Sequence, residues 1–171
     1  MLESTASLGQ NYRTAVNTTT LFPMETRGLV YQAGGKRLID GIDLKISADS
    51  ITVMMGANGA GKSLLLRLLH GLITPNAGKV LWGGEPLTEA LRKRQAMVFQ
   101  RPVLLRRSVT ANIKFVLNLN ATANSDRCHE LLCHVGLAAQ AKQPARLLSV
   151  GEQQRLALAR ALALEPEIMF L

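Results

Sequence analysis

The most diagnostic segment of this chain is Gly56-Ala57-Asn58-Gly59-Ala60-Gly61-Lys62-Ser63. It matches the pattern G-x-x-x-x-G-K-[ST], in which glycines let successive backbone N–H groups turn inward toward phosphate oxygens. The apolar run at 51–55 predicts a buried strand before it, and the leucine-rich run after it predicts a helix from Lys62 to about His70. This strand–loop–helix context predicts a site for the phosphates of a nucleoside triphosphate.

Two side chains at the end of the loop carry its specific chemistry. We expect Lys62 to reach the terminal phosphates as a compact positive charge, and Ser63 to offer its hydroxyl to Mg²⁺. The alternative is a flexible glycine turn between a strand and a helix. That alternative accounts for the glycines but not for the adjacent lysine and serine.

The composition is that of a globular protein without a membrane span. The chain has 171 residues, a hydrophobic fraction of 47% and a formal net charge of +8. This length suits one domain, or one domain with an inserted subdomain. No apolar run approaches the roughly 18–20 residues of a membrane span, and the N-terminus lacks the pattern of a secretory signal. We therefore expect a cytoplasmic protein whose membrane association passes through a partner.

The positive charge does not predict nucleic-acid binding. Aromatic residues make up only 4% of the chain and do not alternate with arginines, as a base-stacking surface requires. We expect a mainly solvated basic face that contacts a partner or acidic lipid headgroups. The basic residues are scattered, apart from a loose cluster at Arg92, Lys93, Arg94, Arg101, Arg106 and Arg107.

The two cysteines do not predict a metal site. His129 and Cys133 are four residues apart and would share a helix face, which makes metal binding conceivable. However, the stretch from Cys128 to His134 does not offer four ligands at zinc-site spacing. We expect two reduced, half-buried cysteines.

The first half of the chain reads as a leader followed by strands. Residues 1–23 are polar without a clean period, which predicts a disordered leader or a start codon placed too early. Strands are expected at 27–31 and 42–46, flanking a turn at 33–36. A short strand is expected at 79–82, and a further apolar segment lies at 96–99.

The second half, after Pro102, reads as helices. Ser108 is expected to cap a helix running to about Leu119, and Ser125 or Asp126 one that ends near Gly136. A helix from Ser149 to about residue 164 alternates Leu with Ala, so we expect it to lie close against a sheet. A strand follows at 168–171. The whole pattern predicts an α/β domain with an antiparallel start, a parallel sheet and a helical insertion.

A second anion-binding segment lies near the end of the chain, at Leu148-Ser149-Val150-Gly151-Glu152-Gln153-Gln154-Arg155. A serine and a glycine at a helix start supply a hydroxyl, free backbone amides and the positive end of the helix dipole. The alternative is an ordinary serine N-cap. The segment follows the phosphate loop and Gln100 in the chain, and this order favours anion binding over a plain cap.

In this order of motifs the chain resembles the nucleotide-binding subunits of ABC transporters, over roughly residues 24–171. The phosphate loop resembles the family's Walker A loop, Gln100 its Q-loop glutamine, and 148–153 its signature motif. Residues 166–171 resemble the apolar lead-in to Walker B. The run from Leu69 to Pro75, followed by Gly78, is similar to importer ATPases, of the tungstate or phosphate type.

The resemblance implies a P-loop NTPase fold with a helical subdomain at about 102–150, ATP and Mg²⁺ as cofactors, and catalytic roles for Lys62 and Gln100. It implies metal contacts from Ser63 and Gln100, with Tyr31 stacking on adenine, although a tyrosine ending a strand is often simply packed. The implied nucleotide contacts are Tyr31, Gly56, Ala57, Asn58, Gly59, Ala60, Gly61, Lys62, Ser63, Leu64, Gln100, Ser149, Gly151 and Glu152.

The implied partners are transmembrane permease subunits and a second nucleotide-binding subunit, in a homodimer on the inner face of the cell membrane. Segments near Gln100–Arg107 would pass the motion of the dimer to the permease. The implied function is coupling of ATP binding and hydrolysis to transport. Alternatives are a soluble non-transport ATPase module of the same superfamily, a hydrolysis-deficient ATP-binding fragment, and an interaction protein whose loop no longer binds nucleotide.

The chain departs from the family pattern in two places. The family places an Asp and a Glu just after the Walker B lead-in and a histidine further on, so we expect this chain to be a C-terminally truncated fragment that hydrolyses ATP poorly. The usual signature also has glycine where this chain has Val150. A side chain there adds bulk beside the amides that meet the γ-phosphate.

Overall fold

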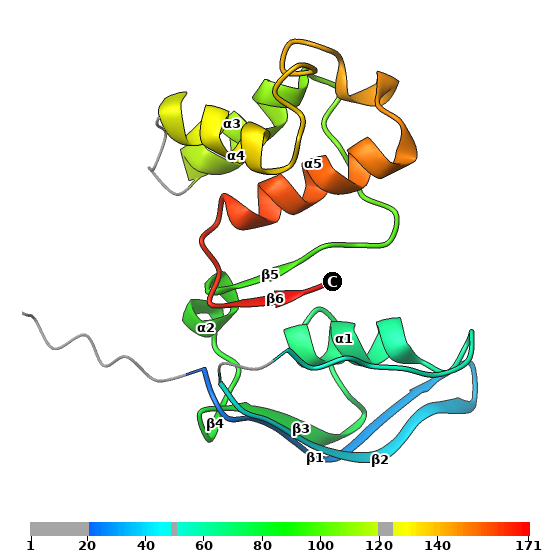
Figure 1. Ribbon diagram of the computed structural model, residues 1–171. Helices are drawn as coiled ribbons and strands as arrows, with labels where there is room; N and C mark the ends of the chain where they lie inside the picture. The colour runs from blue at the N-terminus through cyan, green and yellow to red at the C-terminus, as the bar shows by residue number, and fades with distance from the viewer. Residues whose placement is uncertain (1–20, 49–50, 120–124) are drawn as a thin grey trace, which may run out of the picture.

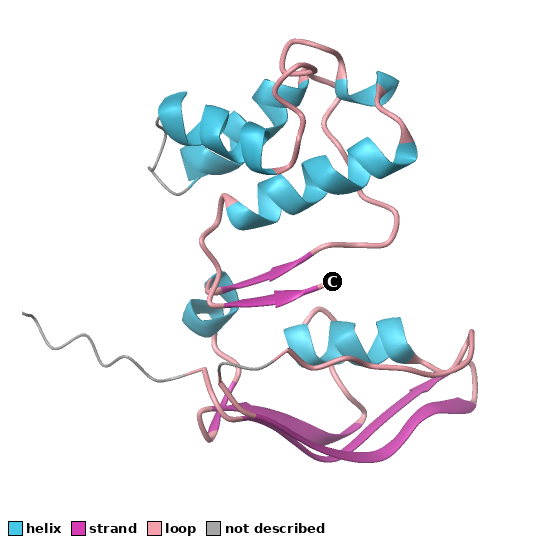
Figure 2. Ribbon diagram, viewed as in Figure 1, coloured by secondary structure: helices cyan, strands magenta, loops and turns pink. Residues whose placement is uncertain are grey.

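The computed structural model describes residues 21–48, 51–119 and 125–171. The elements form a lower part, made of an antiparallel sheet with a helix lying on it, and an upper part made of helices (Figures 1 and 2). A short parallel sheet lies between the two. The mixed α/β architecture with an antiparallel start and a helical insertion is the one that the sequence predicts.

The antiparallel sheet has the strand order β2-β1-β3-β4. The predicted hairpin is confirmed. Gly34 and Gly35 form its tight turn, with the positive φ values of 56° and 73° that such a turn requires. Both strands are longer than expected. Strand β3 adds to the other side of β1, antiparallel to it. The strands are β1 (Met24–Ala33), β2 (Lys36–Ile46), β3 (Ala77–Trp82) and β4 (Glu85–Pro86).

The predicted helix after the phosphate loop is α1 (Lys62–His70), which lies on this sheet. Gly71 ends it in the left-handed conformation, with φ 78°, and donates its N–H to the carbonyl of Leu68. The buried leucines of α1 form the lower core with strand residues and with Leu21, which lies three positions before the predicted domain start at residue 24. This lower core contains Leu21, Met24, Leu29, Ile39, Leu65, Leu68, Leu69, Trp82, Leu91 and Phe170.

The parallel sheet joins segments that are far apart in the chain. After helix α2 (Glu89–Lys93), strand β5 (Gln95–Met97) pairs in parallel with β6 (Ile168–Phe170), and both strands overlap segments that the sequence marks as apolar. The Arg94 guanidinium donates two hydrogen bonds to the Glu167 carboxylate at the start of both strands. Phe170 then packs edge-on against His70 and Trp82, which connects this sheet to the lower core.

One prediction about the lower part is wrong: residues 51–55 do not form a buried strand. The segment has no strand assignment, and the side chains of Ile51, Val53 and Met55 are 94%, 73% and 81% exposed. Only Met54 packs against the lower core. An apolar β-branched run favours a strand, but a strand also needs a hydrogen-bonded neighbour, and none of the described residues pairs with this one.

The upper part is built from α3 (Val109–Leu119), α4 (Ser125–His134), the 3₁₀ helix η1 (Ala145–Leu147) and α5 (Val150–Leu162). The predicted Ser108 cap and the predicted end of α4 are confirmed, since Ser108 Oγ accepts from the N–H of Ala111 and Gly136 turns the chain after α4 with φ 65°. Ser125 and Asp126, expected as the cap of α4, lie within its first turn instead. The helices share the upper core, which contains Val109, Ile113, Val116, Leu117, Cys128, Leu131, Leu132, Val135, Leu137, Ala145, Leu148, Leu156, Ala159 and Ala163.

Helix α5 differs from the prediction in its packing partner. Its small side chains were expected to face a sheet, but Leu156, Ala159 and Ala163 are buried in the upper core against the other helices. The helix also contacts strand β5 of the parallel sheet. The alternation of Leu and Ala favours close approach to any apolar surface, so the sequence does not specify which one.

The two cysteines on α4 differ in burial. Cys128 lies in the upper core and Cys133 is exposed, rather than both being half-buried, because a spacing of five places them on different faces of a helix. Both are free thiols. In residues 21–48, 51–119 and 125–171, no three His, Cys, Asp or Glu side chains lie together as a metal site would need. Within the same ranges, no helix combines the length and apolarity required to span a bilayer.

Candidate nucleotide-binding site

The loop before α1 has the backbone of a phosphate cradle. Gly56, Gly59 and Gly61 have φ values of 156°, 82° and 84°. The latter two lie in the left-handed region, which non-glycine residues rarely adopt. Gly61 also lies against the sheet, since a Cβ at this position would be 3.2 Å from Cδ1 of Ile39 and 3.3 Å from the carbonyl oxygen of Leu38. The glycines are therefore needed for both the turn and the close approach.

The N-terminus of α1 is open to an anion. Gly61 occupies the N-cap and supplies no side-chain acceptor, so the first amides of the helix keep their capacity to donate. The first turn contains no acidic residue. The hydroxyl-bearing Ser63 is exposed, as are Ala57, Asn58 and Ala60. Free amides and the helix dipole together favour negative charge at this position.

The side chain of Lys62 turns back over the loop. Its ammonium group donates hydrogen bonds to the carbonyl oxygens of Gly56 at 2.7 Å and Ala57 at 2.8 Å. These bonds hold a positive charge directly above the cradle, at the position where phosphate oxygens would lie. The loop thus combines a glycine-rich backbone, a helix N-terminus and one lysine cation, which is the donor set that a polyphosphate requires.

The signature segment forms the capped start of α5. Ser149 Oγ accepts from the N–H of Glu152 at 3.4 Å, while the Glu152 carboxylate accepts from both the N–H and the hydroxyl of Ser149 at 2.7 Å. This is a capping box. The bonds from the Ser149 hydroxyl and N–H lower the pKa of Glu152 below its ordinary value. Gly151 is exposed, and Val150 is 76% exposed at the tip of the helix.

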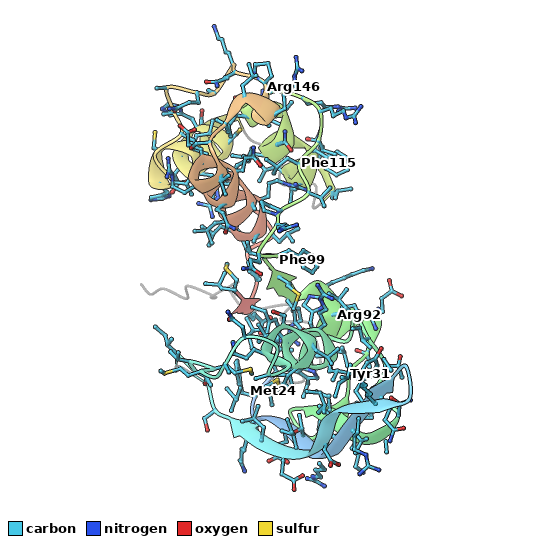
Figure 3. The ribbon with its side chains drawn as sticks, turned by 90° about the vertical axis from the view of Figure 1, so that its right-hand side faces the viewer. Met24, Tyr31, Arg92, Phe99, Phe115 and Arg146 are labelled. Atoms are coloured by element: carbon cyan, nitrogen blue, oxygen red, sulfur yellow. The ribbon has the colours of Figure 1, made fainter. Side chains whose placement is uncertain are left out.

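Gln100 lies just after β5, between the two parts of the molecule. Its carbonyl oxygen accepts a hydrogen bond of 2.5 Å from Nε2 of Gln154 on α5. The preceding Phe99, which Figure 3 shows between the two parts, lies with its ring centroid 5.9 Å from the guanidinium of Arg67 on α1. The segment is thus bound to the phosphate-loop helix on one side and to the signature helix on the other.

Arg67 and Gln154 are contributions that the sequence motifs did not identify. Gln154 directly follows the signature, and Arg67 lies one turn beyond Ser63. Their closeness in sequence to the motifs could have suggested a role at the site. Their contacts could not be predicted in this way, because Phe99 lies 32 positions from Arg67 and Gln100 lies 54 positions from Gln154.

Tyr31 lies on β1, where it pairs with Ile39 of β2. Ile39 of β2 lies against Gly61 of the phosphate loop, so β1, which carries Tyr31, is the next strand beyond β2. Its side chain is half-buried and packs against the lower core. The structure therefore separates Tyr31 from the loop by strand β2, and its ring is partly used in packing.

The structure joins some of these segments and not others. The loop before α1, the chain leaving β5 and the N-terminal end of α5 all lie on the same side of the molecule (Figure 1). Among the described residues, however, no hydrogen bond or ion pair links 149–152 to the phosphate loop of the same chain. The two anion-binding ends belong to separate halves, the loop to the lower part and the signature to the upper part.

Comparison with known proteins identifies the family. Residues 39–171 match the sequence profile described as ABC transporter. The chain is 40% identical over 151 residues to a methionine import ATP-binding protein of Caulobacter vibrioides, covering 81% of this chain and 45% of that protein. It is 40% identical over 152 residues to an aliphatic sulfonates import ATP-binding protein of Pseudomonas putida, covering 87% of this chain and 54% of that protein.

The solved structures agree. The structure of cbiO1 from Clostridium perfringens, part of the ABC transporter complex cbiONQ, superposes with a TM-score of 0.72 at 27% identity, covering 85% of this chain and 63% of that one. The chain spans about half the length of the two curated relatives, 45% and 54%. With the profile match, the motif order and the fold in agreement, this chain belongs to the ABC transporter family of ATP-binding proteins.

Proposed function

We propose that this chain is the ATP-binding part of an import ABC transporter and couples ATP binding and hydrolysis to transport through a membrane permease. The observation that carries the proposal is the donor-rich cradle at Gly56–Ser63, with Lys62 held above it, on the same side of the molecule as a second helix start at Ser149. Two import ATP-binding proteins among the relatives support the transport role. The substrate type, tungstate or phosphate, stays a prediction.

The phosphates of ATP bind at the cradle. The amides of Gly59 and of Gly61 to Leu64 donate to phosphate oxygens, and Lys62 exchanges its two carbonyl partners for the terminal phosphates. Tyr31 supports the adenine ring from the neighbouring sheet. The exposed, acid-free surface of the loop fits a highly charged anion.

The residues present also fit Mg²⁺. Ser63 offers an exposed hydroxyl at the loop, and Gln100 offers an amide oxygen on the segment bound to both α1 and α5. Mg²⁺ is normally held by few protein oxygens together with phosphates, so these two side chains and the nucleotide would share it. When bound, the ion neutralises charge on the transferring phosphoryl group.

The site is completed by a second copy of the chain. Because 149–152 is not bonded to the loop of its own chain, its exposed Ser149 and Gly151 are available to a γ-phosphate held by the partner. For Ser149 to donate to that phosphate, its hydroxyl must leave the Glu152 carboxylate, while Glu152 keeps the helix start in place through the backbone N–H bond. Two head-to-tail half-sites then bury two ATP molecules, and the γ-phosphate favours the closed dimer.

The chain acts at the inner face of the membrane through its permease. The segment 100–107 leaves the Gln100 junction and leads to α3, so a change at the nucleotide site is passed to residues 102–150, which we assign as the helical subdomain of a domain spanning 24–171. Positioning and charge stabilisation supply most of the catalysis of phosphoryl transfer, and Lys62 and Gln100 are the described residues that contribute to it.

A matched pair of serine variants tests the proposal. Ser149 and Ser108 are both N-caps, so replacing either by alanine should cost a similar ~1 kcal/mol of helix stability. Only S149A should weaken the dimer that Mg-ATP induces, measured by analytical ultracentrifugation, while ATP binding to the monomer, measured by calorimetry, stays unchanged in both. A chain that binds no ATP, or S149A and S108A dimerising equally, would refute the proposed site.

A further inference from the structure

An open pocket in the upper part is lined by three arginines. Its volume is about 590 Å³, and the residues around it are Arg106, Arg107, Ser108, Pro144 and Arg146. It lies where the chain entering α3 meets the chain entering η1. Figure 3 places Arg146 at the upper end of the molecule, far from Tyr31 and the sheet. This pocket is separate from the proposed nucleotide site.

The backbone that carries the arginines is fixed. Ser108 and Pro144 form an isolated antiparallel bridge. The N–H of Ala145 donates to the carbonyl of Arg107 at 2.9 Å, and the N–H of Val109 donates to the carbonyl of Gln143 at 3.0 Å. Ala145 and Val109 are fully buried beneath the pocket. The three guanidinium groups therefore extend from a rigid base, although each side chain is itself exposed.

The pocket carries positive charge without an acidic partner. In the part of the chain that the structure describes, none of the seven ion pairs involves Arg106, Arg107 or Arg146. The amides at the start of α3 are already bonded, Val109 to Gln143 and Thr110 to Ala141. A ligand would thus meet guanidinium groups rather than a helix N-terminus. Like charges repel, so three neighbouring cations without an acidic partner do not stabilise the fold through their charge.

We propose that this arginine pocket binds the phosphate headgroup of an anionic phospholipid. A phosphate presents several acceptor oxygens and can engage several guanidinium forks at once, whereas one carboxylate is saturated by a single bidentate arginine. Leu147, which directly follows the pocket residue Arg146, is 60% exposed, and an exposed apolar side chain is suited to the headgroup boundary. The proposal rests on the proposed function only in requiring that the protein works at a membrane.

Vesicle flotation of the full chain tests this. Wild-type protein should float with vesicles of phosphatidylcholine mixed with phosphatidylglycerol and not with phosphatidylcholine alone. The triple variant R106Q/R107Q/R146Q should lose on the order of 100-fold in affinity, since each basic residue near an anionic surface contributes ~1 kcal/mol. The control K36Q/K79Q/R92Q removes the same charge from exposed positions in the lower part and should lose far less.

Each other result would overturn the assignment. Equal losses in both triple variants would mean diffuse attraction by the net charge. Absence of flotation, with inorganic phosphate binding that only the pocket variant loses, would make this a site for free phosphate. Normal flotation of the pocket variant, with lost binding to an acidic polyglutamate peptide, would make it a protein-docking site.

Two further measurements keep the test decisive. If the triple variant unfolds, the single variants R106Q, R107Q and R146Q should each lose about fivefold, and R146K should retain more affinity than R146Q because it keeps the charge. Flotation is measured without ATP or permease. Its failure therefore leaves the nucleotide site standing, and loss of ATP binding in a separate titration leaves the lipid site standing.

Discussion

The ammonium group of Lys62 lies within 2.7 Å of the carbonyl oxygen of Gly56, the first residue of the phosphate loop. The side chain that would hold the terminal phosphates is thus folded back on the loop that would cradle them. ATP must replace this bond and the 2.8 Å bond to Ala57 with stronger charge-assisted bonds to phosphate. Lys62 therefore links the conformation of the loop to the presence of the nucleotide.

We predict that Lys62→Ala lowers the affinity for Mg-ATP by at least ~100-fold, because no other cation is bonded to the loop in the described residues. Isothermal titration calorimetry measures the change. Lys79→Ala, which removes an exposed lysine from β3, is the control and should bind ATP normally. Unchanged affinity in Lys62→Ala would remove this residue from the site.

Val150→Gly should strengthen the ATP-driven dimer by roughly tenfold. The Val150 side chain is 76% exposed at the first turn of α5, so its removal costs little packing and clears space beside the amides that face the γ-phosphate. Sedimentation equilibrium with Mg-ATP measures the dimer affinity. Val103→Gly, at another exposed valine, is the control. A dimer affinity that Val150→Gly leaves unaltered would show that the substitution is harmless.

Two glycines with similar backbone angles should differ sharply in their tolerance of alanine. Gly78 and Gly84 have φ values of 75° and 86°, so alanine strains both by about 1 kcal/mol. A Cβ at Gly78 would also overlap the carbonyl oxygen of Gly28, whereas a Cβ at Gly84 has open space. We expect Gly78→Ala to lose ~3 kcal/mol or more and Gly84→Ala only ~1 kcal/mol in urea unfolding. Similar losses would mean that β1 and β3 can separate at this point.

The stability of the lower core should fall as the pH drops below ~6.5. Burial, and then the positive charge of Arg92, lower the pKa of His70, whose Nδ1 has no hydrogen-bond partner among the described residues. The unfolded chain therefore binds this proton more readily than the folded one. The contribution of His70 is complete above its unfolded pKa and is lost as the pH falls, by at most ~1.4 kcal/mol per pH unit.

Urea unfolding between pH 7.5 and pH 5.5 checks this dependence. His70→Leu should show a flatter pH profile than the wild type, while His134→Gln, at an exposed position, should keep the wild-type slope. Parallel profiles for wild type and His70→Leu would assign the acid sensitivity to other groups.

The amino-acid sequence by itself determined the features that depend on neighbouring residues. The glycine loop, the start of α1 at Lys62 and its end at Gly71 follow from local backbone preferences. The capping box of Ser149 and Glu152 follows from the spacing of two side chains within one helical turn. For this reason the phosphate loop and the signature helix are both found where the pattern predicts them.

Tertiary structure alone decided which distant segments meet. Residues 51–55 have a stronger strand pattern than β5, yet they are exposed, while Gln95 pairs with Ile168 and Met97 with Phe170. Local propensity cannot specify such pairing, because strands are stabilised by partners whose position depends on the folding of the chain between them. The same holds for the contact of Gln154 with Gln100 and for the arginine pocket, where Arg107 and Arg146 meet only because the loops before α3 and η1 are bonded together.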